Sequence, residues 1–313
     1  MGKTLIIGAC GQLGSELTMY LRSLKGKDQI VAADISDPIP YIADGPFERL
    51  NIMDKDAFRQ VITRHQVREV YHLAAILSAK GEQNPLFAWQ LNMESLLTVL
   101  EAGREGLLDK IYWPSSIAVF GPDTPGQETP QSTIMNPNTV YGISKQAGER
   151  WCEYYFEKFG VDVRSLRYPG LIGYKTKPGG GTTDYAVDIF FKAIQHETFD
   201  CFLSKNTKLP MMYMDDAVKA TVDLMEAPSD AISVRSSYNV AAMSFSPEEI
   251  YQAVCEHFPD FKISYQPDFR QAIADSWPDS IDDSTARKDW GWQPKYNLRG
   301  MVQEIISQMT ISI

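Results

Sequence analysis

Tyr141 and Lys145 are the pair whose types and spacing point most directly to catalysis. On a helix, residues four apart lie on the same face, one turn from each other. A free tyrosine keeps its proton until about pH 10 and is therefore a poor base at neutral pH. A lysine cation one turn away favours the phenolate, so we expect it to lower the pKa of Tyr141. The alternative is a surface pair without function, because this spacing also occurs by chance.

The sequence around the pair predicts the helix that this arrangement requires. The turn-forming residues Asn136, Pro137 and Asn138 come just before Tyr141, and the stretch 146–155 supports a helix of several turns. We therefore expect Tyr141 near the beginning of a helix.

A glycine-rich loop follows the first predicted strand. Lys3–Ile7 is a short apolar run typical of a buried strand, and a helix is predicted from Ser15. Strand, glycine loop and helix are the context of a dinucleotide-binding site. Its glycines let the backbone approach a pyrophosphate, whose charge the helix N-terminus attracts. The spacing is GxxGxxG rather than the general GxGxxG. The residues expected to bind the dinucleotide here are Gly8, Gly11, Gln12, Leu13 and Gly14.

Asp34 ends the second predicted strand, over 29–33, and stands twenty residues after Gly14. At this position a carboxylate accepts hydrogen bonds from the adenosine ribose of a dinucleotide. It also repels the 2′-phosphate of NADP, so the sequence favours NAD as the cofactor. The alternative is a loop aspartate that caps a turn.

Strands and helices alternate over the first half of the chain, with a long helix predicted over 85–104. This alternation predicts an α/β protein with a Rossmann-type, doubly wound parallel sheet, whose ligands bind at the carboxyl ends of the strands. We expect His72 to be structural rather than a base. The further strands are predicted over 47–52, 67–75, 111–114 and 161–168. Further cofactor contacts are expected from Asn51, Ile52, Leu73, Ala74, Ala75, Asn92, Tyr168 and Pro169.

The pattern changes after residue 172, which divides the chain into two parts. We expect an NAD-binding Rossmann domain over 1–174, completed by parts of 213–243. The remainder, 175–313, is expected to form mainly a smaller α/β substrate-binding lobe.

The composition excludes several classes of function. Of 313 residues, 44% are hydrophobic and 22% are charged, which is typical of a globular protein. The net charge of −10 argues against nucleic acid and anionic membranes as partners. No apolar run approaches the ~18–20 residues that span a bilayer, and we expect no signal peptide. The four scattered cysteines favour a reducing cytoplasm, and no Cys or His spacing indicates a metal site.

With these residues in hand, the chain resembles the extended short-chain dehydrogenase/reductase family over nearly its whole length. In this family a serine, a tyrosine and a lysine form the catalytic set, which the resemblance assigns to Ser116, Tyr141 and Lys145. Ser115 is the alternative if the register differs by one residue. Besides the glycine loop and Asp34, the shared motifs are His72-Leu73-Ala74-Ala75, Ser116-Ile117-Ala118-Val119-Phe120-Gly121, Arg167-Tyr168-Pro169-Gly170, Asp215-Asp216-Ala217 and Trp290-Gly291-Trp292-Gln293-Pro294.

Within the family, the chain is most similar to the NAD-dependent L-threonine 3-dehydrogenases of the short-chain type, notably at 73–79, 167–172 and 179–186. The similarity implies oxidation of the 3-hydroxyl of L-threonine to 2-amino-3-oxobutanoate, a step of threonine catabolism. It also implies homodimers formed by the helix near 92–104 and the Tyr141 helix. The substrate contacts it implies are Ser78, Ser116, Tyr141, Thr182 or Thr183, and Trp277.

A flexible segment over 175–183 is expected to act as a lid. Its glycines, Gly179 to Gly181, would let Thr182 and Thr183 close over the substrate. Alternatively, the threonines cap the next helix, Ser78 starts a helix and Trp277 is a packing residue.

Two other functions stay open. A nucleotide-sugar epimerase or dehydratase has the same fold and catalytic set, but it needs polar contacts for a diphosphate, and the C-terminal part shows no basic cluster suited to one. A non-catalytic NAD-binding sensor is disfavoured by the complete catalytic set.

Overall fold

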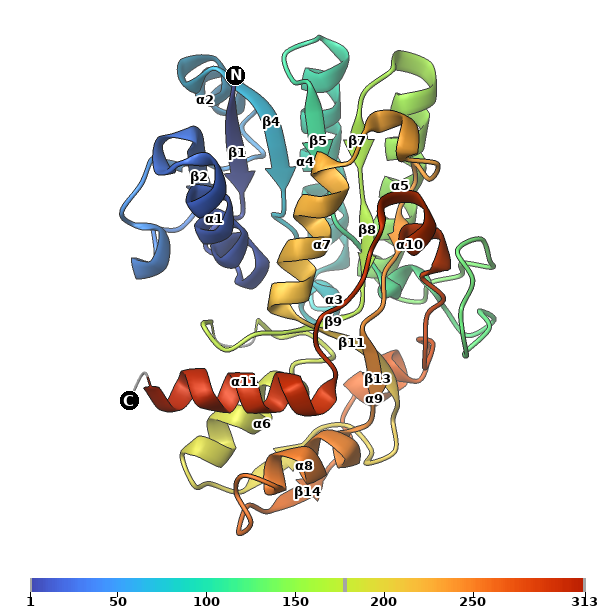
Figure 1. The fold of residues 1–313 in the computed structure, drawn as a ribbon. Helices are drawn as coiled ribbons and strands as arrows, with labels where there is room; N and C mark the ends of the chain where they lie inside the picture. The colour runs from blue at the N-terminus through green and yellow to red at the C-terminus, as the bar shows by residue number, and fades with distance from the viewer. Residues whose placement is uncertain (1, 177–178, 312–313) are drawn as a thin grey trace.

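Six parallel strands form the central sheet in the part of the chain that this computed structural model describes, residues 2–176 and 179–311 (Figure 1). Their order is β3-β2-β1-β4-β5-β7, and each neighbouring pair is parallel. The predicted Rossmann-type parallel sheet is thereby confirmed. The strands are β1 (Lys3–Ile7), β2 (Ile30–Asp34), β3 (Phe47–Arg49), β4 (Val67–His72), β5 (Lys110–Tyr112) and β7 (Val163–Arg164).

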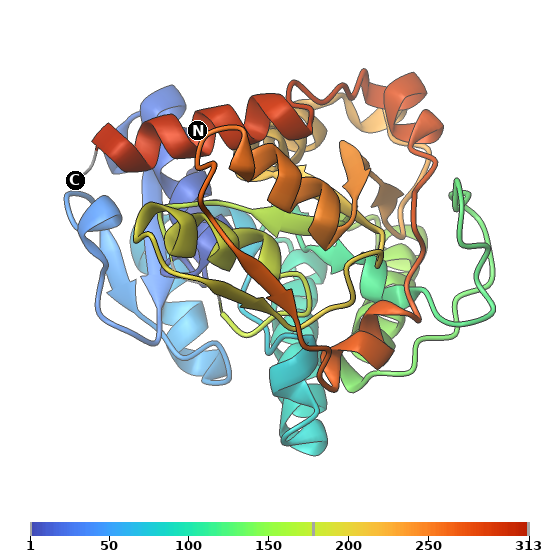
Figure 2. The same ribbon diagram turned by 90° about the horizontal axis from the view of Figure 1, so that it is seen from below.

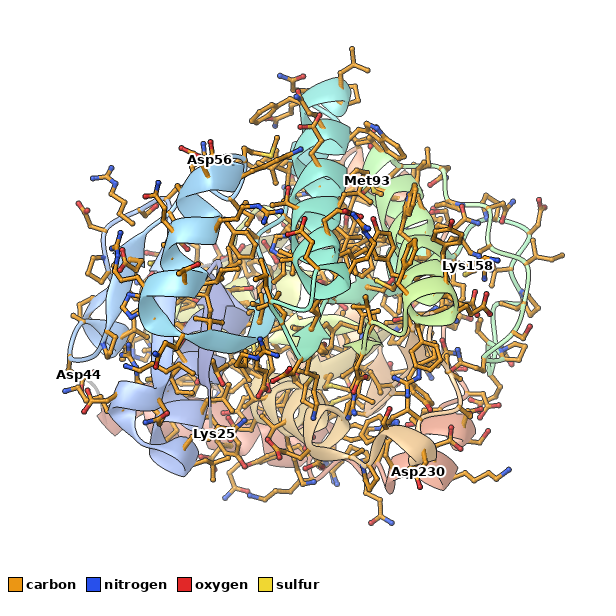
Figure 3. The ribbon with its side chains drawn as sticks, turned by 90° about the horizontal axis from the view of Figure 1, so that it is seen from above. Lys25, Asp44, Asp56, Met93, Lys158 and Asp230 are labelled. Carbon is orange, nitrogen blue, oxygen red and sulfur yellow. The ribbon has the colours of Figure 1, made fainter. Side chains whose placement is uncertain are left out.

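Helices cover both faces of this sheet. They are α1 (Gln12–Lys25), α2 (Lys55–His65), α4 (Pro85–Arg104), α5 (Val140–Phe159) and α7 (Met214–Glu226). Leu5 and Ile7 share a core with α2, α4 and α5, whereas Ile6 shares one with α1 and α7. This alternation follows from the strand geometry, in which successive side chains point to opposite faces. Figure 3 shows the division from above, with Met93 marking α4 on one side and Lys25 marking α1 on the other.

A small parallel sheet continues from the carboxyl ends of β5 and β7. It consists of β12 (Tyr238–Asn239), β8 (Leu166–Tyr168) and β6 (Ser115–Ser116) in this order. Pro114 stands before β6 and has no N–H to donate to a neighbouring strand. Ser165 separates β8 from β7, and its hydroxyl forms a 2.8 Å hydrogen bond with that of Ser237. The strand predicted over 161–168 is therefore two strands, which pair with different neighbours.

The C-terminal part forms a smaller lobe beyond the carboxyl ends of the strands (Figure 1). Within it β11 pairs parallel with β9 but antiparallel with β13, and β10 pairs parallel with β14. Figure 2, seen from below, shows the last helix, α11 (red), beside α8 (orange). The elements are β9 (Gly170–Ile172), β10 (Phe199–Cys201), β11 (Leu209–Tyr213), β13 (Met243–Phe245), β14 (Ile263–Tyr265), α6 (Tyr185–Ile194), α8 (Pro247–Cys255) and α11 (Leu298–Ile311).

Caps in the sequence decide where several helices begin. Asp54 caps α2 by accepting a hydrogen bond from the N–H of Ala57 at 2.9 Å. Thr139 caps α5 by accepting from the N–H of Gly142 at 3.1 Å.

None of the described helices is both long and apolar enough to cross a membrane. The shorter elements are α3 (Ser78–Gly81), α9 (Arg270–Ala274), α10 (Ser284–Trp290) and the 3₁₀ turns η1 (Lys27–Gln29), η2 (Pro40–Ile42), η3 (Ile117–Val119) and η4 (Ser229–Ala231).

Candidate active site

A cavity of about 320 Å³ lies at the carboxyl ends of the parallel strands, where the first sheet meets the C-terminal lobe. Its lining comes from the loop after β1, the segment after β4, β6, α5 and the stretch 179–184. The predicted site residues that line it are Gly8, Gly11, Gln12, Leu13, Gly14, Leu73, Ala75, Ser78, Ser116, Tyr141, Lys145, Tyr168, Pro169, Thr182, Thr183 and Trp277. The fold thus brings together most of the residues that the sequence marks.

The glycine loop forms a cradle of bare backbone. Gly8 has a φ of +84°, and a side chain on it would bring Cβ to 2.8 Å from the Ala74 nitrogen. A Cβ on Gly14 would lie 2.1 Å from the Gly8 carbonyl oxygen. The helix α1 begins directly after Gly11, and no side chain caps its N-terminus. Such a loop and helix start fit a pyrophosphate group.

Asp34 stands at the end of β2, beside this loop. Its Oδ2 accepts a hydrogen bond from the Cys10 N–H at 2.9 Å, and its Oδ1 accepts from the Ser36 N–H at 3.1 Å. The carboxylate is partly exposed, and these two bonds fix its orientation. Its place next to the glycine loop fits the recognition of an adenosine ribose.

Five of the predicted cofactor residues do not line the cavity. Asn92 is buried and uses its amide on the backbone of Ile76, accepting at 2.9 Å and donating at 3.1 Å. Ile52 is buried in the core beneath α2. Asn51 is exposed, and its side chain accepts from the Met53 N–H. Asp34 and Ala74 complete this group.

Tyr141 stands in the first turn of α5 beside Ser116. Burial raises the pKa of Tyr141 to about 12, and the neighbouring Ser116 side chain acts in the opposite direction. The expected lowering of the pKa of Tyr141 by Lys145 is therefore wrong, because burial sets the direction of the shift.

Lys145 explains this outcome, since its amine is not directed at the tyrosine oxygen. Its Nζ donates to the Pro114 carbonyl at 2.5 Å and lies 4.3 Å from the centre of the Trp113 ring. Burial lowers the pKa of Lys145 to about 7, although the charges of Cys152 and Glu149 act in the opposite direction. A lysine with a pKa of about 7 is only partly protonated at neutral pH, so its positive charge near Tyr141 is reduced but not lost.

The two adjacent serines have different surroundings. Ser115 is buried, and its hydroxyl donates to Oε1 of Glu149 at 2.6 Å. Ser116 is partly exposed next to Tyr141, and its hydroxyl accepts from the Ala118 N–H at 3.2 Å. The geometry favours Ser116 over Ser115 as the serine that acts with Tyr141.

The stretch 179–184 closes the cavity from the lobe side. Thr182 is buried, and its hydroxyl lies 3.3 Å from that of Ser78, whereas Thr183 is partly exposed. Asp184, which sequence reasoning missed as a site residue, accepts from the N–H groups of Gly180 and Gly181 at 2.8 and 2.7 Å. Burial raises the pKa of this carboxyl group. The sequence signal was available, because an acid directly follows the threonine pair. Residues 177 and 178 of the predicted flexible segment lie outside the described residues.

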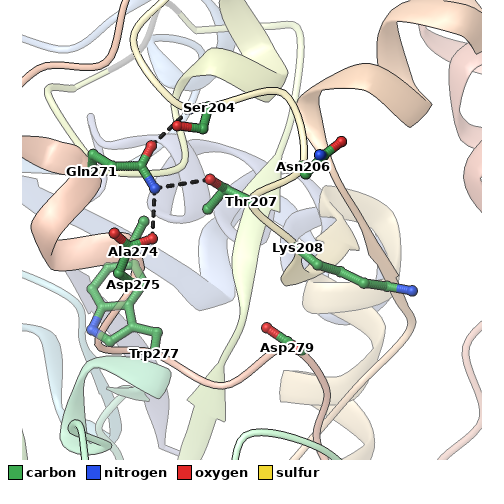
Figure 4. A pocket seen from close by; sticks show the side chains of 9 residues that line it. All are labelled: Ser204, Asn206, Thr207, Lys208, Gln271, Ala274, Asp275, Trp277 and Asp279. Carbon is green, nitrogen blue, oxygen red and sulfur yellow. Dashed lines mark hydrogen bonds between the residues drawn. The ribbon is translucent and has the colours of Figure 1, made fainter.

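Trp277 belongs to the linings of two hollows. One is the cavity, and the other is a more polar hollow of about 420 Å³ on the lobe surface (Figure 4). Beside Trp277 in the second hollow, the Gln271 side-chain amide accepts a hydrogen bond from the Ser204 N–H. It also donates to the side chains of Thr207 and Asp275. The indole also packs against both the lobe core and the cluster around Phe120, so it has a structural role as well.

His72 and Tyr168 turn their side chains into the core. His72 is buried, its Nε2 lies 2.8 Å from the Ser95 hydroxyl, and burial lowers its pKa to about 3. The Tyr168 hydroxyl accepts from that of Tyr112 at 2.6 Å and also contacts Thr221. His72 is therefore structural, as predicted. The hydroxyl of Tyr168 is occupied by Tyr112 and Thr221, so it is not available to a ligand.

The remaining lining residues carry little chemical signal in the sequence. Pro114 presents its carbonyl to Lys145, and the others supply apolar side chains or bare backbone. Nothing in their types distinguishes them before folding. Besides Asp184, the lining residues that the prediction missed are Leu77, Pro114, Ile117, Gly170, Leu171, Gly179 and Gly181. Ser115, the alternative catalytic serine, lines the cavity as well.

Comparison with known sequences finds one matching family. The sequence profile of the NAD dependent epimerase/dehydratase family matches residues 4–241, which include the glycine loop and the Tyr141 pair. An uncharacterized epimerase/dehydratase of Staphylococcus haemolyticus is 48% identical over 306 residues, covering 97% of this chain and 96% of the relative.

Comparison with solved structures is more specific. A partial consensus L-threonine 3-dehydrogenase superposes with a TM-score of 0.97 at 56% identity, over 99% of each chain. The holo form of a GalE-like L-threonine dehydrogenase from Cupriavidus necator superposes with a TM-score of 0.96 at 54% identity, over 98% of this chain and 99% of the other. Both structures share the fold of this chain over nearly its whole length.

Proposed function

Because this chain belongs to the NAD dependent epimerase/dehydratase family, we propose that it oxidises the 3-hydroxyl of L-threonine with NAD, giving 2-amino-3-oxobutanoate and NADH. The observation that carries the proposal is the charge inside the cavity. Among the described residues that line it, Lys145 is the only basic side chain and Asp184 the only acidic one, apart from the phenols of Tyr141 and Tyr168. A nucleotide sugar needs cations for its diphosphate, whereas an amino acid needs a carboxylate for its ammonium group. The similar structures described as L-threonine dehydrogenases support this substrate.

The family is NAD-dependent, and the residues on the β1 side fit that cofactor. The bare backbone at Gly8 and Gly14 and the start of α1 would hold the pyrophosphate, and Asp34 would hold the adenosine ribose. When bound, NAD supplies the acceptor for the hydride that leaves C3 of threonine.

Tyr141 is the proposed general base. As a phenolate it removes the proton of the 3-hydroxyl, and Ser116 donates a hydrogen bond to the same substrate oxygen. Lys145 lies one helical turn away, 5.5 Å from the centre of the Tyr141 ring. Its amine can rotate from the Pro114 carbonyl toward the Tyr141 oxygen and stabilise the phenolate as it forms.

The lobe side would hold the two charged ends of threonine. Asp184 is the buried carboxylate available to the ammonium group, and the hydroxyls of Ser78, Thr182 and Thr183 are available to the carboxylate. We assign Trp277 to the wall beside the substrate. A site that bonds both ends should discriminate against analogues that lack either.

We propose the division 1–174 and 175–313 for cofactor and substrate. In its support, α7 packs on α1, and β12 pairs with β8, so parts of 213–243 return to the cofactor side. Of the proposed substrate residues, Thr182, Thr183, Asp184 and Trp277 come from the second part, whereas Ser78, Ser116 and Tyr141 come from the first.

We further propose a cytoplasmic homodimer that pairs α4 and α5 of each protomer. The two helices pack together, and α5 exposes Ile143, Trp151, Tyr154 and Phe159. The rings of Trp151 and Phe159 each lie 5.9 Å from that of Tyr154, and neighbouring exposed apolar side chains of this kind mark protein interfaces. All four cysteines are free, as a reducing compartment allows. Light scattering after size exclusion measures the oligomeric state, and a monomer at micromolar concentration would refute the dimer.

Steady-state NADH production with a panel of substrates tests the function. We expect turnover of L-threonine and weaker turnover of L-serine, whose missing methyl group is worth ~1–3 kcal/mol. Almost none is expected with 2-butanol, which lacks both charged ends. Turnover of a nucleotide sugar with L-threonine inert would overturn the assignment in favour of an epimerase or dehydratase. NAD binding without any turnover would favour a sensor.

A further inference from the structure

The segment 114–116, which carries the proposed catalytic serine, lies against α5, and two of its three residues are hydrogen-bonded to that helix. The α5 partners are four residues apart, so they lie on one face of the helix in successive turns. The Pro114 carbonyl accepts from Lys145 Nζ at 2.5 Å, and the Ser115 hydroxyl donates to Glu149 Oε1 at 2.6 Å. The Ser116 side chain lies next to that of Tyr141.

Glu149 is held rigidly from its other side. Arg167 donates from Nε to Oε1 and from Nη2 to Oε2, both at 2.8 Å, while Glu149 and Arg167 are 0% and 3% exposed. The remaining guanidinium nitrogen donates to the Gln131 carbonyl at 2.9 Å and to Asn239 Oδ1 at 3.0 Å. The carboxylate therefore accepts three hydrogen bonds in a fixed geometry.

A buried ion pair of this kind is a weak source of stability, because desolvation offsets much of its attraction. The ion pair matters here because it fixes the position of the Glu149 carboxylate. Arg167 is the register partner of Ser115 in the parallel pair β6–β8, as Tyr168 is of Ser116. Ser115 and Arg167 therefore both donate hydrogen bonds to the Glu149 carboxylate. These bonds connect α5 to both strands.

We propose that Ser115 and Glu149 are positioning residues for the reaction proposed above, on which this inference rests. Through their hydrogen bond they set the separation between Ser116 on β6 and Tyr141 on α5. The bond also keeps the strand in place when Lys145 turns its amine from Pro114 toward the tyrosine. Neither residue exchanges a proton with the substrate.

The test compares Ser115→Ala with Ser165→Ala. Each change removes one buried serine hydroxyl with a short hydrogen bond, but the partner of Ser165 is Ser237, outside the site. Both variants are characterised by thermal unfolding, NAD binding by fluorescence, kcat, KM and the isotope effect with L-threonine deuterated at C3.

We expect Ser115→Ala to lower kcat about tenfold and to raise the isotope effect, since small misplacements of reacting groups slow the chemical step strongly. NAD affinity and KM should stay within about twofold. Ser165→Ala should lose a similar amount of thermal stability without loss of kcat. Equal kcat values in the two variants would overturn the positioning role.

The wild-type protein in the same assay separates this inference from the proposed function. Absence of L-threonine turnover would count against the function alone, and the comparison would then use whichever substrate the panel identifies. Crystal structures of both variants give a readout that needs no substrate. The distance between the Ser116 and Tyr141 oxygens should increase in Ser115→Ala only, and an unchanged distance would also overturn the proposal.

Discussion

The two sides of the cavity are built by different means. On the β1 side the walls are backbone, and Gly8 and Gly14 leave no room for a Cβ. On the lobe side the walls are polar side chains, such as Ser78 and Thr182, which come together from 104 residues apart. The first side depends on the absence of side-chain atoms and the second on their presence. Adding a side-chain atom on the β1 side should therefore weaken cofactor binding. Removing a polar side-chain atom on the lobe side should weaken substrate binding.

Tyr141 stands between the two sides, and its loss should have the largest effect. Tyr141→Phe should lower kcat by roughly 10²–10⁴, the usual weight of a positioned acid–base group, with NAD affinity unchanged. The control is Tyr154→Phe, which removes a hydroxyl from an exposed tyrosine of the same helix. Turnover near the wild-type rate in Tyr141→Phe would exclude the residue from the mechanism.

The pH dependence follows from the same residue. Because burial raises the pKa of Tyr141 to about 12, the competent phenolate becomes more abundant as pH increases. We expect kcat/KM for L-threonine to rise between pH 6 and pH 9 at saturating NAD. Stopped-flow measurements must first show that hydride transfer limits the rate. A flat profile under that condition would contradict the assignment of the base.

Asp34 is the exception on the β1 side, since it acts through a side chain. Asp34→Ala should weaken NAD binding by roughly 1.5–3 kcal/mol, the range for hydrogen bonds to a charged group. It should also narrow the preference of the protein for NAD over NADP. Titration calorimetry with both cofactors measures this. Equal affinity of the wild-type protein for NAD and NADP would show that Asp34 does not bind the ribose.

Gly14→Ala adds one carbon to the backbone wall. Its Cβ would lie 2.1 Å from the Gly8 carbonyl oxygen, so the loop has to shift, at a cost of about 1–3 kcal/mol. NAD binding should weaken, while Gly126→Ala, whose Cβ would have no neighbour within 4 Å, should bind as the wild type does. Equal affinities would mean that the cradle tolerates side chains.

Removing the two lobe hydroxyls should have the smallest effect. The double change Thr182→Ala with Thr183→Ala should raise KM for L-threonine by several-fold, at about 0.5–1.5 kcal/mol for each hydrogen bond lost. NAD affinity should not change, and Thr98→Ala on α4 serves as a control with a buried threonine outside the cavity. A KM equal to that of the wild type would remove this pair from substrate binding.

These differences explain which parts of the site sequence reasoning found. The glycine loop, Asp34 and the Tyr141 pair are local patterns, because one strand and one helix suffice to place them. Asp184 was not predicted as a site residue, because it lines the cavity only when the lobe has folded over the sheet. Asn92 and Ile52 do not line the cavity, since packing turns their side chains elsewhere, and their contact with the cofactor stays a prediction.

The sequence by itself determined the alternation of strands and helices, the long helix from Pro85 to Arg104 and the place of the cofactor loop. Periodicity, caps and glycines are local, so their consequences can be read along the chain. Only the tertiary structure decided that the predicted strand over 161–168 is two strands, that Ser116 and not Ser115 faces Tyr141, and that burial raises the pKa of this tyrosine. Each of these depends on desolvation or on partners distant in sequence, such as Glu149 and Ser115, which become neighbours only when the chain has folded.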